Sequence, residues 1–273
     1  MSAPDVQAPV PLRDASTVVL VRDSAEGIEV FLQRRVQQMA FAGGMTVFPG
    51  GGVDPRDREA QIAWTGPDVE YWAEQFSTDE ASARALVCAA VRETFEECGV
   101  LLAGTADDMH PDPSSLFGAR ARLVAKELSF AQFLNDEGLT LRADLLTPLA
   151  HWITPKNESR RYDTRFFLAA MPDGQEADGE TSEAAETRWQ TAADALAGWD
   201  GGDHFLLPPT WTQLRHIAEY STVADLQAAP RAITPIEPSI SSSGLAGLTF
   251  ADSSEYFTAL GDGRMERLKN TNA

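Results

Sequence analysis

The chain has 273 residues, of which 43% are hydrophobic and 8% aromatic, a composition typical of a globular protein with an ordinary core. Its formal net charge of -19 argues against nonspecific binding to nucleic acid and against docking on an anionic membrane. The two cysteines, Cys88 and Cys98, lie in one predicted helix and cannot form a disulfide while that helix is intact. With no apolar N-terminal signal visible, we expect a cytoplasmic protein, and the abundance of Ala, Asp and Arg suggests a bacterial source.

The N-terminal part of the chain predicts an arm followed by a β-hairpin. Residues 1–13 contain three prolines and no apolar periodicity, so we expect a flexible arm. Residues 16–22 and 28–34 are rich in β-branched and aromatic residues and are separated by turn residues. A short strand over 46–48 then runs into Pro49-Gly50-Gly51-Gly52, where the glycines predict a loop with close backbone approach.

A long helix is predicted next. Ser77 and Glu80 have the spacing of a capping box, with Ser77 as N-cap, and the helix would run to Cys98 with Gly99 just past its end. Trp64 and Trp72 indicate that the preceding segment folds onto the body of the protein. We expect Phe95 to anchor the helix in the core while its glutamates face outward.

Three carboxylates near the end of this helix are the strongest functional signal. Glu93, Glu96 and Glu97 are spaced i, i+3 and i+4, so they share one helix face and repel one another when ionised. A hard divalent cation would relieve this repulsion, and Arg92 can hold Glu96 from one turn away. The alternative is a solvated acidic helix face.

Downstream, the pattern predicts two helices within 105–145, strands over 147–155, 161–170 and 183–189, and helices after Thr191 and Leu206. Alternation places Arg161, Asp163 and Arg165 on one face of their strand. Residues 229–273 are rich in Pro and Ser, and we expect an extension that packs on the body or on a partner subunit.

Together, the segments Phe48-Pro49-Gly50-Gly51 and Arg92-Glu93-Thr94-Phe95-Glu96-Glu97-Cys98-Gly99-Val100 resemble the Nudix hydrolase signature. That pattern is a Gly, five residues, a Glu, seven residues and then R-E-U-x-E-E-x-G-U, where U is a bulky apolar residue. The resemblance implies an α/β fold, a Nudix-type α/β/α sandwich with a mixed sheet and inserted helical elements. The domain would span 14–228, with insertions at about 55–76 and 105–145.

The first half of the signature departs from the family pattern. The pattern places Arg fourteen positions after its first Gly, whereas Arg92 follows Gly51 by 41, so about 27 residues are inserted. Counting back eight from Arg92 reaches Arg84, so the first Glu of the pattern is missing or is replaced by Glu80 after a shift. A signature split in this way resembles the Nudix subgroup that includes a peroxisomal coenzyme A diphosphatase.

The resemblance implies a metal-dependent diphosphatase acting on a small nucleoside diphosphate derivative, such as coenzyme A or acyl-coenzyme A, as a homodimer. Glu93, Glu96 and Glu97 would hold Mg²⁺ or Mn²⁺, and Glu96 or Glu183 would act in catalysis, with Glu186 an alternative to Glu183. The missing first Glu motivates a second interpretation, a catalytically weak Nudix-fold nucleotide-binding or regulatory module. The residues expected to contact substrate are Arg34, Gly50, Gly51, Arg161 and Arg165.

Overall fold

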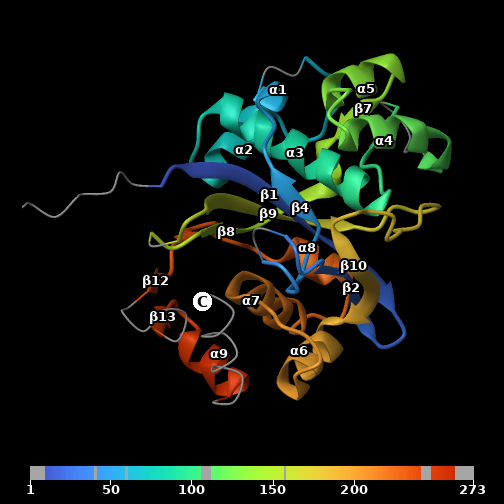
Figure 1. Ribbon diagram of the computed structural model, residues 1–273. Coiled ribbons are helices and arrows are strands. Elements are labelled where there is room, and N and C mark those ends of the chain that lie inside the picture. Colours follow the sequence, from blue (N-terminus) through green and yellow to red (C-terminus); the bar gives the residue numbers. More distant parts are fainter. Residues whose placement is uncertain are drawn as a thin grey trace, which may run out of the picture.

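The computed structural model describes residues 10–39, 42–58, 61–105, 112–156, 158–240 and 247–261. A mixed sheet of eight strands lies between two layers of helices, so the α/β/α sandwich is confirmed (Figure 1). The sheet order is β10-β2-β1-β9-β8-β11, with β3 added to β2 and β4 added to β1. Its strands are β1 (Leu12–Ser24), β2 (Gly27–Arg35), β3 (Thr46–Val47), β4 (Gly50–Gly52), β8 (Leu146–Ile153), β9 (Arg161–Ala170), β10 (Ala184–Thr191) and β11 (Pro235–Ile236).

The predicted hairpin is confirmed, because β1 and β2 pair antiparallel up to the turn between Ser24 and Gly27. On its other side β1 pairs parallel with β9 along ten residues, from Leu12 with Arg161 to Val21 with Ala170. The centre of β1 is buried on both faces of the sheet. Such a strand is a nearly continuous run of β-branched and aliphatic residues, as Thr17 to Val21 are.

One face of the sheet carries the acidic helix and the inserted segments (Figure 1). Trp72 and Phe76 of α2 pack against Phe167 of β9 there, with ring centroids 5.5 and 5.1 Å away. This buried anchoring confirms that the segment around Trp72 folds onto the body. The elements on this face are α1 (Pro55–Arg58), α2 (Val69–Phe76), α3 (Glu80–Cys98), the 3-10 turns Pro113–Leu116 and Ala143–Leu145, α4 (Phe117–Val124), α5 (Phe130–Asp136) and a small sheet of β5 (Trp64–Thr65), β6 (Ala103–Gly104) and β7 (Thr140–Arg142).

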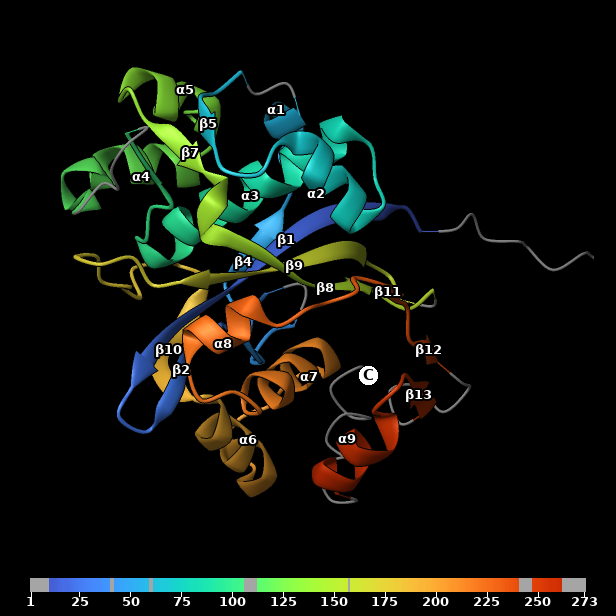
Figure 2. The same ribbon diagram turned by 180° about the vertical axis from the view of Figure 1, so that it is seen from behind.

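The opposite face is covered by the C-terminal helices, as the reverse view shows (Figure 2). Thr191 caps the first of them by accepting a hydrogen bond from the Asp194 amide, as predicted. Sequence patterning did not identify α8 or α9, although the buried Tyr256 of α9 donates a hydrogen bond to the Leu206 carbonyl at 2.9 Å. These elements are α6 (Ala192–Gly201), α7 (Pro208–Ile217), α8 (Val223–Ala228), the pair β12 (Ser239–Ile240) and β13 (Leu248–Thr249), and α9 (Ser253–Leu260).

Two local predictions were wrong. Ser77 does not start the long helix: it ends α2 in a left-handed conformation, and Asp79 caps α3 by accepting from the Ser82 amide. The glycine triplet is not a free loop, because Gly50, Gly51 and Gly52 pair antiparallel with β1 opposite Thr17, Ser16 and Ala15. An Asp shortly after a Ser offers an equally good cap, and patterning could not distinguish the two.

Part of what the sequence predicts lies outside the described residues, namely most of the arm over 1–13, part of the loop after Gly104, and 241–246 and 262–273 of the C-terminal extension. Within the described segments, no helix is both long enough and apolar enough to cross a membrane.

Candidate active site

Helix α3 contacts the sheet in its N-terminal half, and an arginine side chain binds its C-terminal end. Near its N-terminal half, the buried Ser16 hydroxyl donates to the Leu86 carbonyl at 2.6 Å. At its C-terminus, Gly99 adopts φ 71°, which only glycine takes without strain. Arg120 donates to the Glu96 carbonyl at 3.1 Å and pairs with Asp178 at 2.6 Å. A cation at this helix end offsets the unfavourable dipole that the nearby carboxylates would otherwise face.

The three acids of α3 are buried, which corrects the expectation that they face outward. Glu93, Glu96 and Glu97 are 8%, 7% and 4% exposed. A solvated acidic helix face, the alternative interpretation of this cluster, is therefore wrong.

The glycine strand β4 forms one wall of the site. The Gly50 amide donates to Glu97 Oε2 at 2.8 Å, and Gln33 Nε2 of β2 donates to the same oxygen at 2.7 Å. A Cβ added at Gly51 would lie 2.5 Å from the carboxyl carbon of Glu93. Only glycine therefore allows the backbone to approach the acids this closely.

Burial raises the pKa of two of these acids toward neutrality. Desolvation raises the pKa of Glu93 to about 7, against the favourable charge of Arg92. Desolvation, then the charge of Glu93, raises the pKa of Glu97 to about 8. Both carboxyl groups are thus poised to exchange a proton for another positive charge near neutral pH.

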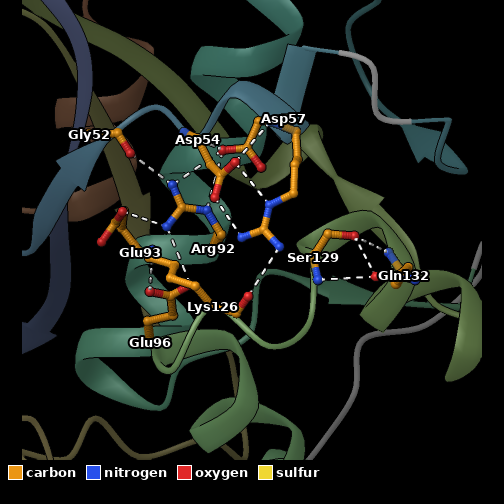
Figure 3. A network of polar contacts seen from close by, with 10 residues as sticks. Gly52, Asp54, Asp57, Arg92, Glu93, Glu96, Lys126, Ser129 and Gln132 are labelled. Atoms are coloured by element: carbon orange, nitrogen blue, oxygen red, sulfur yellow. Dashed lines mark hydrogen bonds and ion pairs between the residues drawn. The ribbon is translucent and has the colours of Figure 1, made fainter.

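Arg92 is the centre of the polar network around these acids (Figure 3). Its guanidinium lies 2.6 Å from Glu93 Oε1 and 3.3 Å from Glu96 Oε1. It also donates to the Gly52 carbonyl at 2.9 Å and pairs with Asp57 Oδ2 at 3.2 Å. One buried cation therefore links the acidic helix to the glycine strand and to α1.

Asp57 stands at the position of the first Glu of the Nudix pattern, the carboxylate that counting back from Arg92 did not locate. Five residues separate it from Gly51, which is the family spacing between the first Gly and the first Glu when counted forward. Counting backward from Arg92 crossed the inserted segment and reached Arg84, whose guanidinium lies 5.8 Å from the Trp64 ring centroid. Glu80 is exposed at the start of α3. Asp57, unlike Arg84 and Glu80, is both buried and paired directly with Arg92.

Asp54, two residues after β4, forms an Asx turn. Its carboxylate accepts hydrogen bonds from the Arg56 amide at 2.9 Å and from the Arg56 side chain. The Arg56 side chain is the main reason that the pKa of Asp54 is lowered to about 2.

The other predicted acid near the site is Glu183, in the loop before β10. Its Oε2 lies 3.0 Å from Arg35 Nη2, and its charge contributes to the raised pKa of Glu97. Glu186 instead pairs with Arg34 at 3.2 Å, and both side chains are well exposed. Arg34 was expected to contact substrate. Because adjacent residues of a strand point to opposite faces, Arg34 lies on the opposite face of β2 from Gln33.

Sequence reasoning missed Gln33, and of the adjacent Arg34 and Arg35 it chose Arg34, whereas Gln33 and Arg35 are the residues that contact Glu97 and Glu183. Gln33 and Arg35 share a strand face with Phe31, which packs in the cluster under α3. Extending the alternation of β2 by two and four residues from Phe31 would have identified them. Each carries a buried polar atom with no partner among the described residues, Gln33 Oε1 and Arg35 Nε.

The structure does not bring Arg161 and Arg165 into the contacts of the α3 acids. Arg161 donates to the Thr154 carbonyl and pairs with Glu237 at 2.6 Å. Arg165 pairs with Asp163 at 2.8 Å and with Asp14 at 3.5 Å. Both arginines thus link the start of β9 to neighbouring segments.

The donor chemistry of the acidic site fits a hard divalent cation, although its side chains are engaged by protein cations. Among the described residues, no group of three or more His, Cys, Asp or Glu side chains converges as a ready metal site. Glu93 and Glu96 contact Arg92, and Glu96 also lies 3.6 Å from Lys126 Nζ. The repulsion between Glu93 and Glu97 is what an oxygen-bound cation relieves.

Comparison with known proteins identifies the family of this chain. The family model for the NUDT19 Nudix domain matches residues 73–217, which is 145 of the 273 residues. The chain therefore belongs to the Nudix family, within the branch that this NUDT19 model describes. A NUDIX hydrolase crystal structure from Alicyclobacillus acidocaldarius matches with a TM-score of 0.68 and 27% identity, covering 83% of this chain and 100% of that one.

Curated relatives agree with this assignment. The acyl-coenzyme A diphosphatase NUDT19 of Homo sapiens is 25% identical over 242 residues, covering 74% of this chain and 64% of that protein. Putative nudix hydrolase 7 of Caenorhabditis elegans is 27% identical over 207 residues, covering 76% of this chain and 61% of that protein. The chain thus spans less than two thirds of the length of these relatives.

Proposed function

We propose that this chain is a metal-dependent diphosphatase that hydrolyses the diphosphate of coenzyme A or an acyl-coenzyme A to two phosphomonoesters. The observation that carries the proposal is the buried pair Glu93 and Glu97 against the backbone of Gly50 and Gly51. A structural surface helix has no need to bury two mutually repelling carboxyl groups, because each costs free energy in the folded protein.

Glu93, Glu96 and Glu97 would hold Mg²⁺ or Mn²⁺ through their carboxylate oxygens. When bound, such an ion neutralises diphosphate oxygens and lowers the pKa of a coordinated water. Arg92 holds Glu93 and Glu96 in position, and Asp57 fixes Arg92 from the other side. These contacts give the site rigidity without occupying the Glu97 carboxylate.

Glu183 is the proposed general base. A water oxygen forms a bond to one phosphorus, Glu183 accepts the water proton, and the bond from that phosphorus to the bridging oxygen breaks. The bridging oxygen leaves with the second phosphate, so both products are phosphomonoesters. Arg35 orients Glu183 by an ion pair of 3.0 Å.

The substrate class is supported by the relatives, since the human protein bears the name acyl-coenzyme A diphosphatase. The split signature supports the same branch. The catalytically weak binding module loses its main support, because it depended on a missing first carboxylate and Asp57 now supplies one.

Further parts of the proposal rest on the sequence alone. These are the cytoplasmic location, the homodimer, the bacterial source, the absence of a nucleic-acid or membrane partner and the domain limits of 14–228. Arg161 and Arg165 remain proposed substrate contacts only if substrate displaces Glu237 and Asp163, their partners in the structure.

The test is to incubate the protein with Mn²⁺ or Mg²⁺ and a panel of coenzyme A, acetyl-coenzyme A, NADH, ADP-ribose and a dinucleoside polyphosphate. We expect metal-dependent release of phosphomonoesters, fastest with the coenzyme A compounds. Phosphorus NMR of the products identifies the cleaved bond. Hydrolysis of ADP-ribose or NADH alone would refute the proposed substrate, and no turnover of any compound would refute the diphosphatase.

A further inference from the structure

A lysine from the second insertion reaches into the acidic site. Lys126 lies in the turn between α4 and α5, and its Nζ is 3.6 Å from Glu96 Oε2. The Glu96 side chain is 8% exposed, whereas that of Lys126 is 54% exposed. The lysine thus extends over the acid from the solvent side, and it is drawn beside Glu96 in Figure 3.

The backbone of this turn is built to direct the lysine there. Lys126 has φ 61°, in the left-handed region that disfavours every residue with a Cβ atom. Its amide donates to the Leu123 carbonyl at 2.8 Å, and its own carbonyl accepts from Arg56 of the first insertion at 3.4 Å. Both insertions therefore fix a strained residue whose side chain points at Glu96.

The turn is also anchored to the helix that carries Glu96. Phe133 of α5 stacks on Phe95 of α3 with ring centroids 5.4 Å apart, and Phe95 precedes Glu96. Ser129 starts α5 with a capping box that includes Gln132. The position of Lys126 relative to Glu96 is thus set by buried packing, not only by the ion pair.

Resting on the proposed function, we propose that Lys126 is a resident counter-ion of Glu96, which a divalent cation displaces and which then binds the substrate diphosphate. In the metal-free protein the ammonium partly neutralises Glu96 and competes with the incoming ion for its carboxylate. Once displaced, the ammonium remains tethered over the site, where a phosphate oxygen is its natural partner. Lys126 is therefore a positioning residue before metal binding and a substrate contact after it.

The test is a titration of metal-free protein with Mn²⁺ in the absence of substrate. The electron paramagnetic resonance signal of the unbound Mn²⁺ gives the dissociation constant. Lys126→Met should bind Mn²⁺ about two- to fivefold more tightly than the unmodified protein, as expected for loss of a partly exposed ion pair. Lys126→Arg should stay near the original affinity. Lys156→Met, an equal charge change in the exposed turn between β8 and β9, is the matched control and should change nothing.

Steady-state kinetics at saturating Mn²⁺ test the second part of the proposal, that Lys126 contacts the substrate diphosphate. Lys126→Met should raise KM for coenzyme A with kcat little changed. Lys126→Gly suits the left-handed backbone and replaces the Met variant if that variant folds poorly. Equal Mn²⁺ affinity in Lys126→Met and the control would refute the role of Lys126 as counter-ion of Glu96. An unchanged KM would refute its role as a substrate contact. Failure of the unmodified protein to bind Mn²⁺ would instead refute the proposed function.

Discussion

Asp57 and Arg92, 35 positions apart in the sequence, form a buried ion pair with 3.2 Å between Asp57 Oδ2 and Arg92 Nη2. Each side chain is 3% exposed. Removing one partner of such a pair leaves an uncompensated buried charge. Here the remaining guanidinium keeps Glu93 and Glu96 as partners, which reduces the cost.

Asp57→Asn should therefore lower the free energy of unfolding by about 1–3 kcal/mol, below the range for pairs that lose their only partner. Urea denaturation measures this. Glu80→Gln is the control, because Glu80 is exposed at the start of α3 and its replacement should cost no more than about 0.5 kcal/mol. An equal loss in both variants would show that Asp57 does not hold Arg92.

Glu97→Gln should lower kcat/KM for the preferred diphosphate by about 100-fold or more, because a metal ligand is lost. The fold should remain, since an amide oxygen can still accept the hydrogen bonds from Gly50 and Gln33. Glu186→Gln, an exposed glutamate beside Arg34, should keep full activity. Circular dichroism and initial rates of both variants check this, and a fully active Glu97→Gln would refute the metal site.

The stability of the metal-free protein should fall as pH rises from about 5 to about 8. Glu93 and Glu97 have pKa values raised from 4.5 to about 7 and about 8 on folding. Between these limits the folded state binds more protons than the unfolded state, so the free energy of unfolding decreases with pH.

Melting temperatures in the presence of a chelator measure this slope. Saturating Mg²⁺ should flatten it, because the ion replaces the protons, and Glu97→Gln should reduce it without metal. A melting temperature that rises over this window, with no effect of Glu97→Gln, would contradict the assigned protonation.

Glu183→Gln should lower kcat by about 100-fold or more, in the range for loss of a general base, with little change in KM. Arg35→Gln should cause a smaller loss, because it removes the group that orients Glu183. Initial rates over a range of substrate concentration separate kcat from KM. A Glu183→Gln variant with unchanged kcat would move the base elsewhere in the site.

The local patterns of the sequence predicted the framework well. Alternation and β-branched residues located β1, β2 and β9, while Gly99 and Thr191 marked helix boundaries through their own backbone and side-chain chemistry. The acidic helix was likewise predicted from the spacing of Glu93, Glu96 and Glu97, because periodicity is a local property.

What the sequence could not show depended on contacts across the insertions. The burial of the acids arises from chain segments folded over α3, and periodicity does not report what covers a helix face. Asp57 was missed because the spacing was counted only from Arg92, although counting from Gly51 reaches it. Lys126 could not be found at all, since its proximity to Glu96 depends on the packing of Phe133 on Phe95.

We propose that the carboxylates of α3 hold the metal ion that diphosphate hydrolysis requires. Anomalous diffraction at the manganese edge from crystals soaked in Mn²⁺ tests it most directly. We predict an anomalous peak bound by carboxylate oxygens of Glu93 and Glu97, and its loss in Glu97→Gln crystals. A peak at other residues, or none at a Mn²⁺ concentration that supports hydrolysis, would contradict the account.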